Sequence, residues 1–227
     1  MAKKQTGAIR IVHDLQPLNA VTIKNAELPP AVEQFSELYA GKSIYTLMDI
    51  YVGYDHCLLA ERSRDLTTFQ TPIGTFHLTT LPVGRTNSVP IFQGDVAFIL
   101  RDEYDIARNF VDDIPVAGPP TQYKLADGGY ETIPDNSGIR RFVWEHFTDV
   151  NRILTRFRHA GLTVLAKKLY LGSPEVIIVG HKCTYKGRVP EDSQVEKISN
   201  WPCPANTSEI QIFLGVTGVV RIIIIII

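Results

Sequence analysis

The sequence contains little cysteine, and this scarcity argues against zinc-binding and disulfide-stabilised domains. Its three cysteines, Cys57, Cys183 and Cys203, lie far apart and include no Cys-x-x-Cys pair of the kind that binds zinc. Their odd, small number provides no disulfide framework, which is typical of chains that remain in a reducing compartment. We therefore expect an intracellular protein, located in the cytoplasm or the nucleus.

A long hydrophobic run and an excess of one charge are also missing. No apolar stretch reaches the ~18 residues needed to span a membrane, and the Met1–Lys4 start is not followed by an apolar signal core, so no membrane partner is expected. The 23 Lys and Arg residues balance 24 Asp and Glu residues, and a net charge of −1 excludes a protein that coats DNA by bulk charge alone. With 44% hydrophobic residues, the 227-residue chain suits one large or two small globular domains.

Apolar residues recur at helical spacing in several segments, and capping residues mark their ends. The expected helices are residues 30–40 before Gly41; a helix capped by Ser88 that carries Phe92, Val96 and Ile99; residues 138–160 before Gly161; and a short helix at 213–220.

Other segments are β-branched and apolar, or are rich in turn-forming residues. The expected strands are residues 9–14, 43–50, 162–166 and 175–180, together with a hairpin at 67–80 that turns at Pro72-Ile73-Gly74 and a long loop at 118–137. Because tight hairpins recur between helices, an α+β fold with an antiparallel sheet backed by helices fits better than a doubly wound parallel sheet.

Three acids stand in or beside apolar strands. Asp49 ends the segment 43–50, and Asp112 and Asp113 interrupt the apolar run 105–118. An acid in such a setting is strongly desolvated unless it is paired or bound to a metal. Carboxylates that converge from strands onto Mg²⁺ are what phosphoryl transfer through two metal ions requires. A bare Asp-Asp pair is nevertheless more often an exposed turn, so the acids alone leave both interpretations open.

Six blocks of sequence, read in order, place the acids in a wider pattern. They are RIVHDLQPLN, LMDIYVGYDH, TTFQTPIGTFHLTTLPVGRTNSVPIFQ, NFVDDI, AKKLYLGSPEVIIVGH and IFLGV. In this order they resemble the reverse transcriptase of the pol polyprotein of gypsy-type LTR retrotransposons, from about residue 3 to residue 221. The resemblance implies the fingers and palm of a right-handed polymerase, and DNA synthesis templated by RNA or DNA.

The same resemblance implies a division of the chain and a set of partners. Residues 1–23 and 57–86 would be N-terminally truncated fingers, residues 24–56 and 87–190 the palm, and residues 191–227 the start of the thumb or connection. The expected partners are an RNA or DNA template with its primer, dNTP, and the remainder of a pol polyprotein that includes RNase H and integrase.

The family's metal-binding residues match the three acids. Asp49 corresponds to the first metal-binding aspartate, and Phe110-Val111-Asp112-Asp113 corresponds to the aromatic-x-Asp-Asp motif. The resemblance implies that Asp49 and Asp112 bridge two Mg²⁺ ions, with Mn²⁺ as a substitute, and that Asp113 is the supporting acid.

The family's nucleotide-binding residues match the block after Asp49 and two positions near the start of the chain. Tyr54 falls where the family places an aromatic ring beneath the incoming sugar, which would select dNTP over NTP. The backbone N–H groups of Val52 and Gly53 match those that approach the triphosphate. Arg10 resembles the arginine that contacts the triphosphate, and Lys3 is expected as a second cation or as a solvated terminal residue.

Val179 and Gly180 resemble the turn of the primer grip, which holds the primer terminus against the metals. A purely structural role for the neighbouring His181 fits at least as well as contact with nucleic acid. Between residues 138 and 170, seven Lys and Arg residues face two acids, so this segment either follows nucleic-acid phosphates or is a solvated helix face.

Two other classes of protein remain as alternatives. Gln16 stands where the family usually has arginine, and Val83 replaces a bulkier side chain beside the nucleotide. With truncation at both ends, these departures favour a catalytically silent relic or a binding module that keeps the palm fold. A different two-metal enzyme, such as a nuclease, ranks third because the Tyr54 and primer-grip blocks would have no purpose there.

Overall fold

The computed structural model describes residues 2–3, 9–10, 13–25 and 29–224. Within the predicted strand 9–14, strand β2 (Ile9–Arg10) pairs antiparallel with β1 (Ala2–Lys3). Residues 11–12 lie outside the described residues, and residues 13–14 are not in a strand, so the confirmed strand is shorter than predicted.

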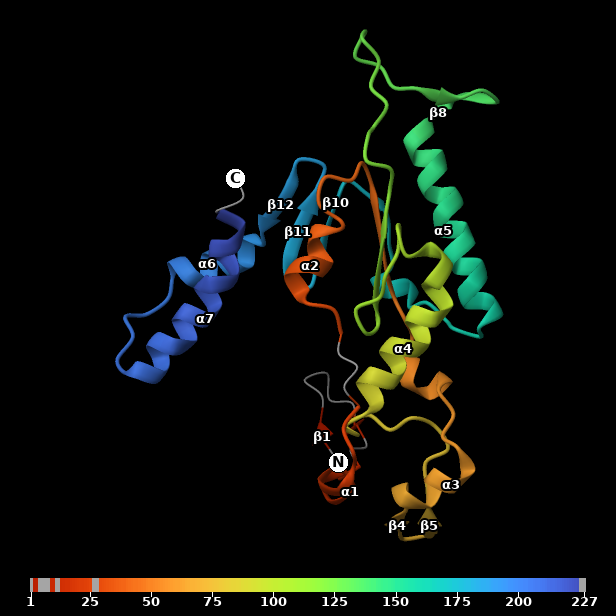
Figure 1. Ribbon diagram of the computed structural model, residues 1–227, viewed down its shortest axis with the longest axis vertical. Coiled ribbons are helices and arrows are strands. Elements are labelled where there is room, and N and C mark those ends of the chain that lie inside the picture. The colour runs from red at the N-terminus through yellow and green to blue at the C-terminus, as the bar shows by residue number, and fades with distance from the viewer. Residues whose placement is uncertain (1, 4–8, 11–12, 26–28, 225–227) are drawn as a thin grey trace.

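A three-stranded antiparallel sheet forms the centre of the molecule (Figure 1). Its middle strand β3 (Tyr45–Asp49) lies between β6 (Asp113–Ala117) and β9 (Tyr170–Ser173). Tyr45 pairs with Ala117 at one end of the register, and Asp49 pairs with Asp113 at the other. The pairing therefore brings two of the three acids noted in the sequence to the same edge of the sheet.

Strand β3 is buried on both faces because the chain packs helices and a second sheet around it. On one face, Met48 and Ile50 contact α4 (Ser88–Leu100) and α5 (Arg141–His159) in the larger apolar core. On the other face, Tyr45 lies in a smaller core with residues of α2 (Val32–Glu37). A three-stranded sheet also lies on this side and consists of β10 (Glu175–Ile178), β11 (His181–Thr184) and β12 (Gly187–Pro190). This double cover explains why the predicted strand 43–50 is a nearly continuous apolar run.

The remaining elements are short, except for one helix near the C-terminus. They are α1 (Gln16–Val21), η1 (Gly53–His56), α3 (Glu61–Arg64), η2 (Asp65–Thr67), β4 (Phe69–Thr71), β5 (Gly74–Phe76), η3 (Arg101–Glu103), β7 (Thr132–Ile133), β8 (Asn136–Arg140), η4 (Ala166–Lys168), α6 (Asp192–Ser199) and α7 (Thr207–Ile224).

Most of the predicted elements are confirmed. The hairpin β4–β5 turns between Thr71 and Gly74 as expected. Helix α5 is followed by Gly161 at a φ of +76°, a left-handed conformation in which glycine is favoured. Helix α7 is much longer than the predicted 213–220. No helix in the described part of the chain combines the length and apolarity that crossing a membrane requires.

Three predictions were wrong in detail. Asn87, not Ser88, is the N-cap residue of α4, because the Ser88 hydroxyl donates instead to the Pro82 carbonyl at 2.6 Å. Part of the predicted loop 118–137 forms the hairpin β7–β8, whose second strand displaces the start of α5 to Arg141. Residues 162–166 make one bridge to the residue after β3, Ile50 with Val164, and then enter η4 instead of continuing as a strand.

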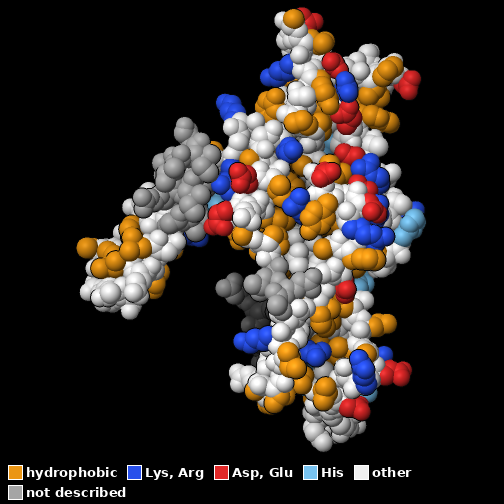
Figure 2. All heavy atoms as spheres, in the orientation of Figure 1, with side chains coloured by type: hydrophobic (Ala, Val, Ile, Leu, Met, Phe, Trp, Pro, Cys, Tyr) orange, Lys and Arg blue, Asp and Glu red, His pale blue; other side chains and the backbone are white. Residues whose placement is uncertain are grey.

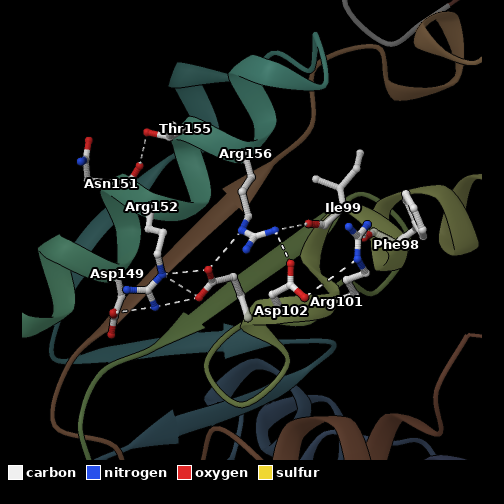
Figure 3. A network of polar contacts seen from close by, with 10 residues as sticks. Phe98, Ile99, Arg101, Asp102, Asp149, Asn151, Arg152, Thr155 and Arg156 are labelled. Atoms are coloured by element: carbon white, nitrogen blue, oxygen red, sulfur yellow. Dashed lines mark hydrogen bonds and ion pairs between the residues drawn. The ribbon is translucent and has the colours of Figure 1, made fainter.

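An ion-pair network joins the end of α4 to α5 (Figure 3). Glu103 in η3 is only 5% exposed, and Arg152 and Arg156 donate to its carboxylate at 2.7 to 3.1 Å. Arg156 also donates to Asp102 at 2.9 Å. The Arg152 hydrogen bonds hold the pKa of Glu103 below its usual range despite its burial. The network therefore fixes the two helices that cover one face of the central sheet.

His146, on α5, gives the fold a predicted pH dependence. It is fully buried, with Nε2 2.8 Å from the Thr46 hydroxyl of β3, and burial lowers the pKa of its imidazole to about 4. An unfolded histidine titrates near 6.5, so between those values the unfolded chain binds a proton that the folded chain excludes. The contribution of neutral His146 to the free energy of unfolding is complete above pH ~6.5 and is lost as the pH falls toward 4.

We expect the free energy of unfolding, measured in urea, to be lower at pH 5.5 than at pH 7, with a slope of at most about 1.4 kcal/mol per pH unit from this group. His181, whose pKa burial also lowers, adds a slope of the same sign. His146→Gln should therefore show a shallower slope than the parent, though not a flat one. An equal slope in the two proteins would contradict the assignment.

Candidate active site

The three acids lie at one edge of the central sheet. Asp49 is the last residue of β3, and its register partner Asp113 is the first residue of β6. Asp112 lies in the turn just before β6, and its carbonyl accepts a hydrogen bond from the Ile50 N–H at 3.1 Å. Asp49 is 6% exposed, Asp113 is half-buried, and Asp112 is exposed. The sequence therefore brings together carboxylates with different degrees of access to solvent.

A tight turn carries Asp112. The Phe110 N–H donates to the Asp113 carbonyl at 2.8 Å, and the Asp113 N–H donates to the Phe110 carbonyl at 3.1 Å. Val111, between them, has a φ of +56°. This left-handed conformation costs a β-branched residue about 1–3 kcal/mol and persists only where the surrounding structure enforces it.

The charges of the acids are coupled. Burial, and after it the negative charges of Asp112 and Asp49, raise the pKa of Asp113. One cation opposes this effect, because Lys168 in η4 places its Nζ 2.6 Å from Oδ2 of Asp49. Lys168 was not identified from the sequence. The only signal was its place in the AKKL stretch after Leu165, and a surface lysine has the same appearance.

The acids offer oxygen ligands of the kind that hard divalent cations prefer, and their mutual repulsion is the condition that such a cation relieves. Within the described ranges, however, no three carboxylate, imidazole or thiol side chains are gathered around one point as a ready metal site. The ammonium of Lys168 instead balances Asp49. The chemistry of these donors therefore fits a divalent metal, while their arrangement is that of an ion pair beside two further acids.

The predicted nucleotide-binding residues form a turn beside the acids. Val52 is left-handed, with a φ of +49°, and Gly53 and Tyr54 enter η1. Phe92 of α4 lies directly beneath this turn, with its ring centroid 5.0 Å from that of Tyr54. Burial raises the pKa of the Tyr54 phenol, and the Asp112 charge adds to that effect, so the ring lies within electrostatic reach of the acids.

Gly53 has no room for a side chain, which leads to a prediction. A Cβ at this position would lie 2.4 Å from Cζ of Phe92. Gly53→Ala should therefore displace the ring and destabilise the fold by about 1–3 kcal/mol in urea unfolding. The control is Gly215→Ala on α7, where nothing lies within 4 Å of an added Cβ, so its stability should be unchanged or slightly higher. Equal effects of the two substitutions would contradict the packing argument.

The other predicted residues lie elsewhere. Val179 and Gly180, with φ values of +48° and +81°, form the two-residue turn between β10 and β11, and Val179 packs against the smaller core. His181, after this turn, is buried, as a structural role requires. Lys3 and Arg10 lie on the paired strands β1 and β2, and their contact with a triphosphate stays a prediction.

Ion pairs neutralise part of the basic segment 138–170. Arg141 pairs with Glu131 and Glu145, while Arg152 and Arg156 pair with the acids of η3. In Figure 2, Lys and Arg side chains alternate with Asp and Glu side chains over the part of the surface that includes α5. The arrangement favours the solvated, paired helix face over a continuous track for phosphates.

Comparison with known proteins identifies chains of similar sequence. The model of the family described as reverse transcriptase (RNA-dependent DNA polymerase) matches residues 1–183. The Tf2-3 and Tf2-7 transposon polyproteins of Schizosaccharomyces pombe are each 23% identical over 219 residues, which cover 96% of this chain and 15% of the relative. The chain thus spans about 15% of the length of these curated relatives.

Solved structures share the fold. A foamy viral protease-reverse transcriptase in complex with double-stranded DNA superimposes with a TM-score of 0.79 and 23% identity, over 97% of this chain and 35% of that one. A second such complex gives a TM-score of 0.73 and 24% identity, over 96% and 41% of the two chains. Together with the antiparallel sheet backed by helices, this likeness confirms the predicted α+β polymerase fold.

Proposed function

Because the chain belongs to the reverse transcriptase (RNA-dependent DNA polymerase) family, we propose that it is the polymerase domain of a gypsy-type LTR retrotransposon pol polyprotein. Its reaction would be the addition of dNTP to a primer 3′-OH, directed by an RNA or DNA template. The observation that carries the proposal is the arrangement of the three acids at the edge of the central sheet. Asp49 faces Asp113 in register there, Asp112 lies in the adjoining turn, and the charge of Asp112 reaches Tyr54.

Asp49, Asp112 and Asp113 would hold the catalytic metals, two Mg²⁺ ions or Mn²⁺ in their place. When bound, such ions lower the pKa of the primer hydroxyl and neutralise the triphosphate. The chain's own residues prepare this site by concentrating negative charge on a half-buried strand end. Until a metal binds, Lys168 balances the most buried of the acids, since its ammonium contacts Asp49 at 2.6 Å.

The residues around η1 would receive the nucleotide. The backbone N–H groups of Val52 and Gly53 would approach the triphosphate, and Arg10 and Lys3 would supply positive charge from β1 and β2. An arginine suits this role because its planar group can hold two phosphate oxygens at once. Tyr54 would lie beneath the sugar and exclude a 2′-hydroxyl, while Val179 and Gly180 would hold the primer end.

The wider assignments follow from the same family. Residues 1–23 and 57–86 would be the fingers, residues 24–56 and 87–190 the palm, and residues 191–227 the start of the thumb or connection. RNase H and integrase would belong to the same polyprotein, as the length of the S. pombe relatives allows. The domain would work in the cytoplasm or the nucleus.

The test is primer extension on an oligo(dT)-primed RNA template with Mg²⁺ and dNTP. We expect products that grow with time, require the template, and disappear when the metal is chelated. Asp135→Asn, which removes an exposed acid outside the site, should extend as the parent does. If a chain shown to be folded by circular dichroism fails to extend any primer, the polymerase proposal is wrong for this chain.

The second candidate is a silent protein that keeps the polymerase fold as a binding module. The observation that favours it is the absence, within the described residues, of three metal-binding side chains gathered around one point. Such a protein would retain labelled primer–template in a filter-binding assay yet extend nothing at any Mg²⁺ or Mn²⁺ concentration.

A further inference from the structure

Two buried amide side chains surround the turn that carries Asp112. Gln93 lies on α4 and is 8% exposed, and Asn109 lies just before the turn and is 2% exposed. Neither residue belongs to the acids or to the nucleotide-binding block. Buried amides of this kind persist where their hydrogen bonds are satisfied, so their partners indicate what they hold in place.

Their hydrogen bonds converge on the turn. The Gln93 Oε1 accepts from the Val111 N–H at 2.7 Å, and the Gln93 Nε2 donates to the Asn109 carbonyl at 3.0 Å. The Asn109 Nδ2 donates in return to the Gln93 carbonyl at 3.1 Å and to the Val111 carbonyl at 3.4 Å. Both backbone polar groups of Val111 are therefore held by amide side chains, one of which comes from a helix distant in sequence.

Val111 is also the residue with the unfavourable left-handed φ of +56°. Its conformation sets the direction in which the backbone continues to the next residue, Asp112, so a relaxation at Val111 would shift the exposed carboxylate relative to Asp113. Because Gln93 bonds directly to the Val111 N–H, it opposes that relaxation from the buried face of α4. The preceding residue, Phe92, packs its ring against that of Tyr54, so two neighbouring residues of α4 contact both sides of the site.

We propose that Gln93 and Asn109 are positioning residues that hold Asp112 in the orientation required for binding a divalent metal. The inference rests on the proposed function, because it takes the three acids to be the metal ligands. Groups that orient metal ligands typically change metal affinity 10–100-fold when they are removed.

The experiment measures binding of Mn²⁺ to the folded chain by electron paramagnetic resonance, without nucleic acid or nucleotide. Gln93→Met keeps the length of the side chain and removes its hydrogen bonds, and we expect Mn²⁺ to bind about tenfold more weakly. The matched control is Gln70→Met, the same chemical change at an exposed position on β4, which should bind Mn²⁺ as the parent does. Asp112→Asn serves as the reference for loss of a ligand.

A second variant covers the case in which Gln93→Met does not fold. Asn109→Ser removes the other half of the pair with its two donated bonds, and we expect weaker Mn²⁺ binding than in the parent. Circular dichroism identifies which variants are folded. If every folded variant of the pair binds Mn²⁺ as tightly as the parent, the positioning role is overturned while the metal site stands. If the parent itself binds no Mn²⁺, both the inference and the metal assignment of the proposed function are overturned.

Discussion

Asp112→Asn is expected to abolish primer extension while leaving the chain folded. The substitution keeps the shape of the side chain and removes one of two adjacent negative charges at the start of β6. If Asp112 holds the catalytic metals as proposed, neutralising it should cost at least about 10³-fold in rate, or about 4 kcal/mol of transition-state stabilisation. The free energy of unfolding should be unchanged or slightly higher, because repulsion between the carboxylates is relieved.

The charge of Asp113 provides an independent check of this prediction. Its pKa is raised first by burial and then by the charges of Asp112 and Asp49. Asp112→Asn should therefore lower the pKa of Asp113, as a carboxyl titration by NMR would show. Primer extension by the variant is compared with the parent and with Asp135→Asn under identical metal and template. Retained extension by a folded Asp112→Asn chain would remove Asp112 from the metal site.

The sequence predicts the fold well where periodicity and caps act locally. The apolar stripe of α5 and the glycine that follows it, Gly161, mark one helix, and the β4–β5 hairpin is marked by its turn residues. Pairing between distant segments is not encoded in such local patterns. The turn-rich residues before Arg141 are therefore typical of a loop although β7 and β8 pair there. Residues 162–166 are typical of a strand although their pairing is limited to a single bridge, Ile50 with Val164.

The same distinction between local patterns and contacts across the fold applies to the residues of the candidate site. Asp49, Asp112 and Asp113 could be proposed as site residues from the sequence, because both their place in or beside apolar strands and the order of the six blocks are visible there. Lys168 and Gln93 were not identified, since each acts through side-chain hydrogen bonds across the fold. Lys168 bonds to Asp49 at 2.6 Å, and Gln93 bonds to the Val111 N–H at 2.7 Å and to the Asn109 carbonyl at 3.0 Å. Nothing local distinguishes such a lysine or glutamine from others of its type. Residues that support a site therefore have to be found in the three-dimensional arrangement.

Tyr54→Val is expected to admit ribonucleotides. The Tyr54 ring packs on Phe92, with ring centroids 5.0 Å apart, and this contact favours one position of the ring. If this ring lies beneath the incoming sugar, as proposed, it leaves no space for a 2′-hydroxyl, whereas valine would open that space. Steric exclusion of this kind is lost with the side chain, and we expect the preference for dNTP over NTP to fall about 100-fold, equivalent to about 2.7 kcal/mol.

The measurement is kcat/KM for dTTP and for UTP on the same RNA template, in the parent and the variant. The change should be confined to UTP, because a smaller side chain removes an obstacle without removing a contact to the triphosphate. Tyr104→Val is the matched control, since Tyr104 is exposed and its ring stacks on Arg108 away from η1. If Tyr54→Val discriminates as strongly as the parent, the ring is not the sugar gate. The tilted Tyr54–Phe92 pair would then serve only to pack α4 against η1, and sugar selection would have to reside in another residue.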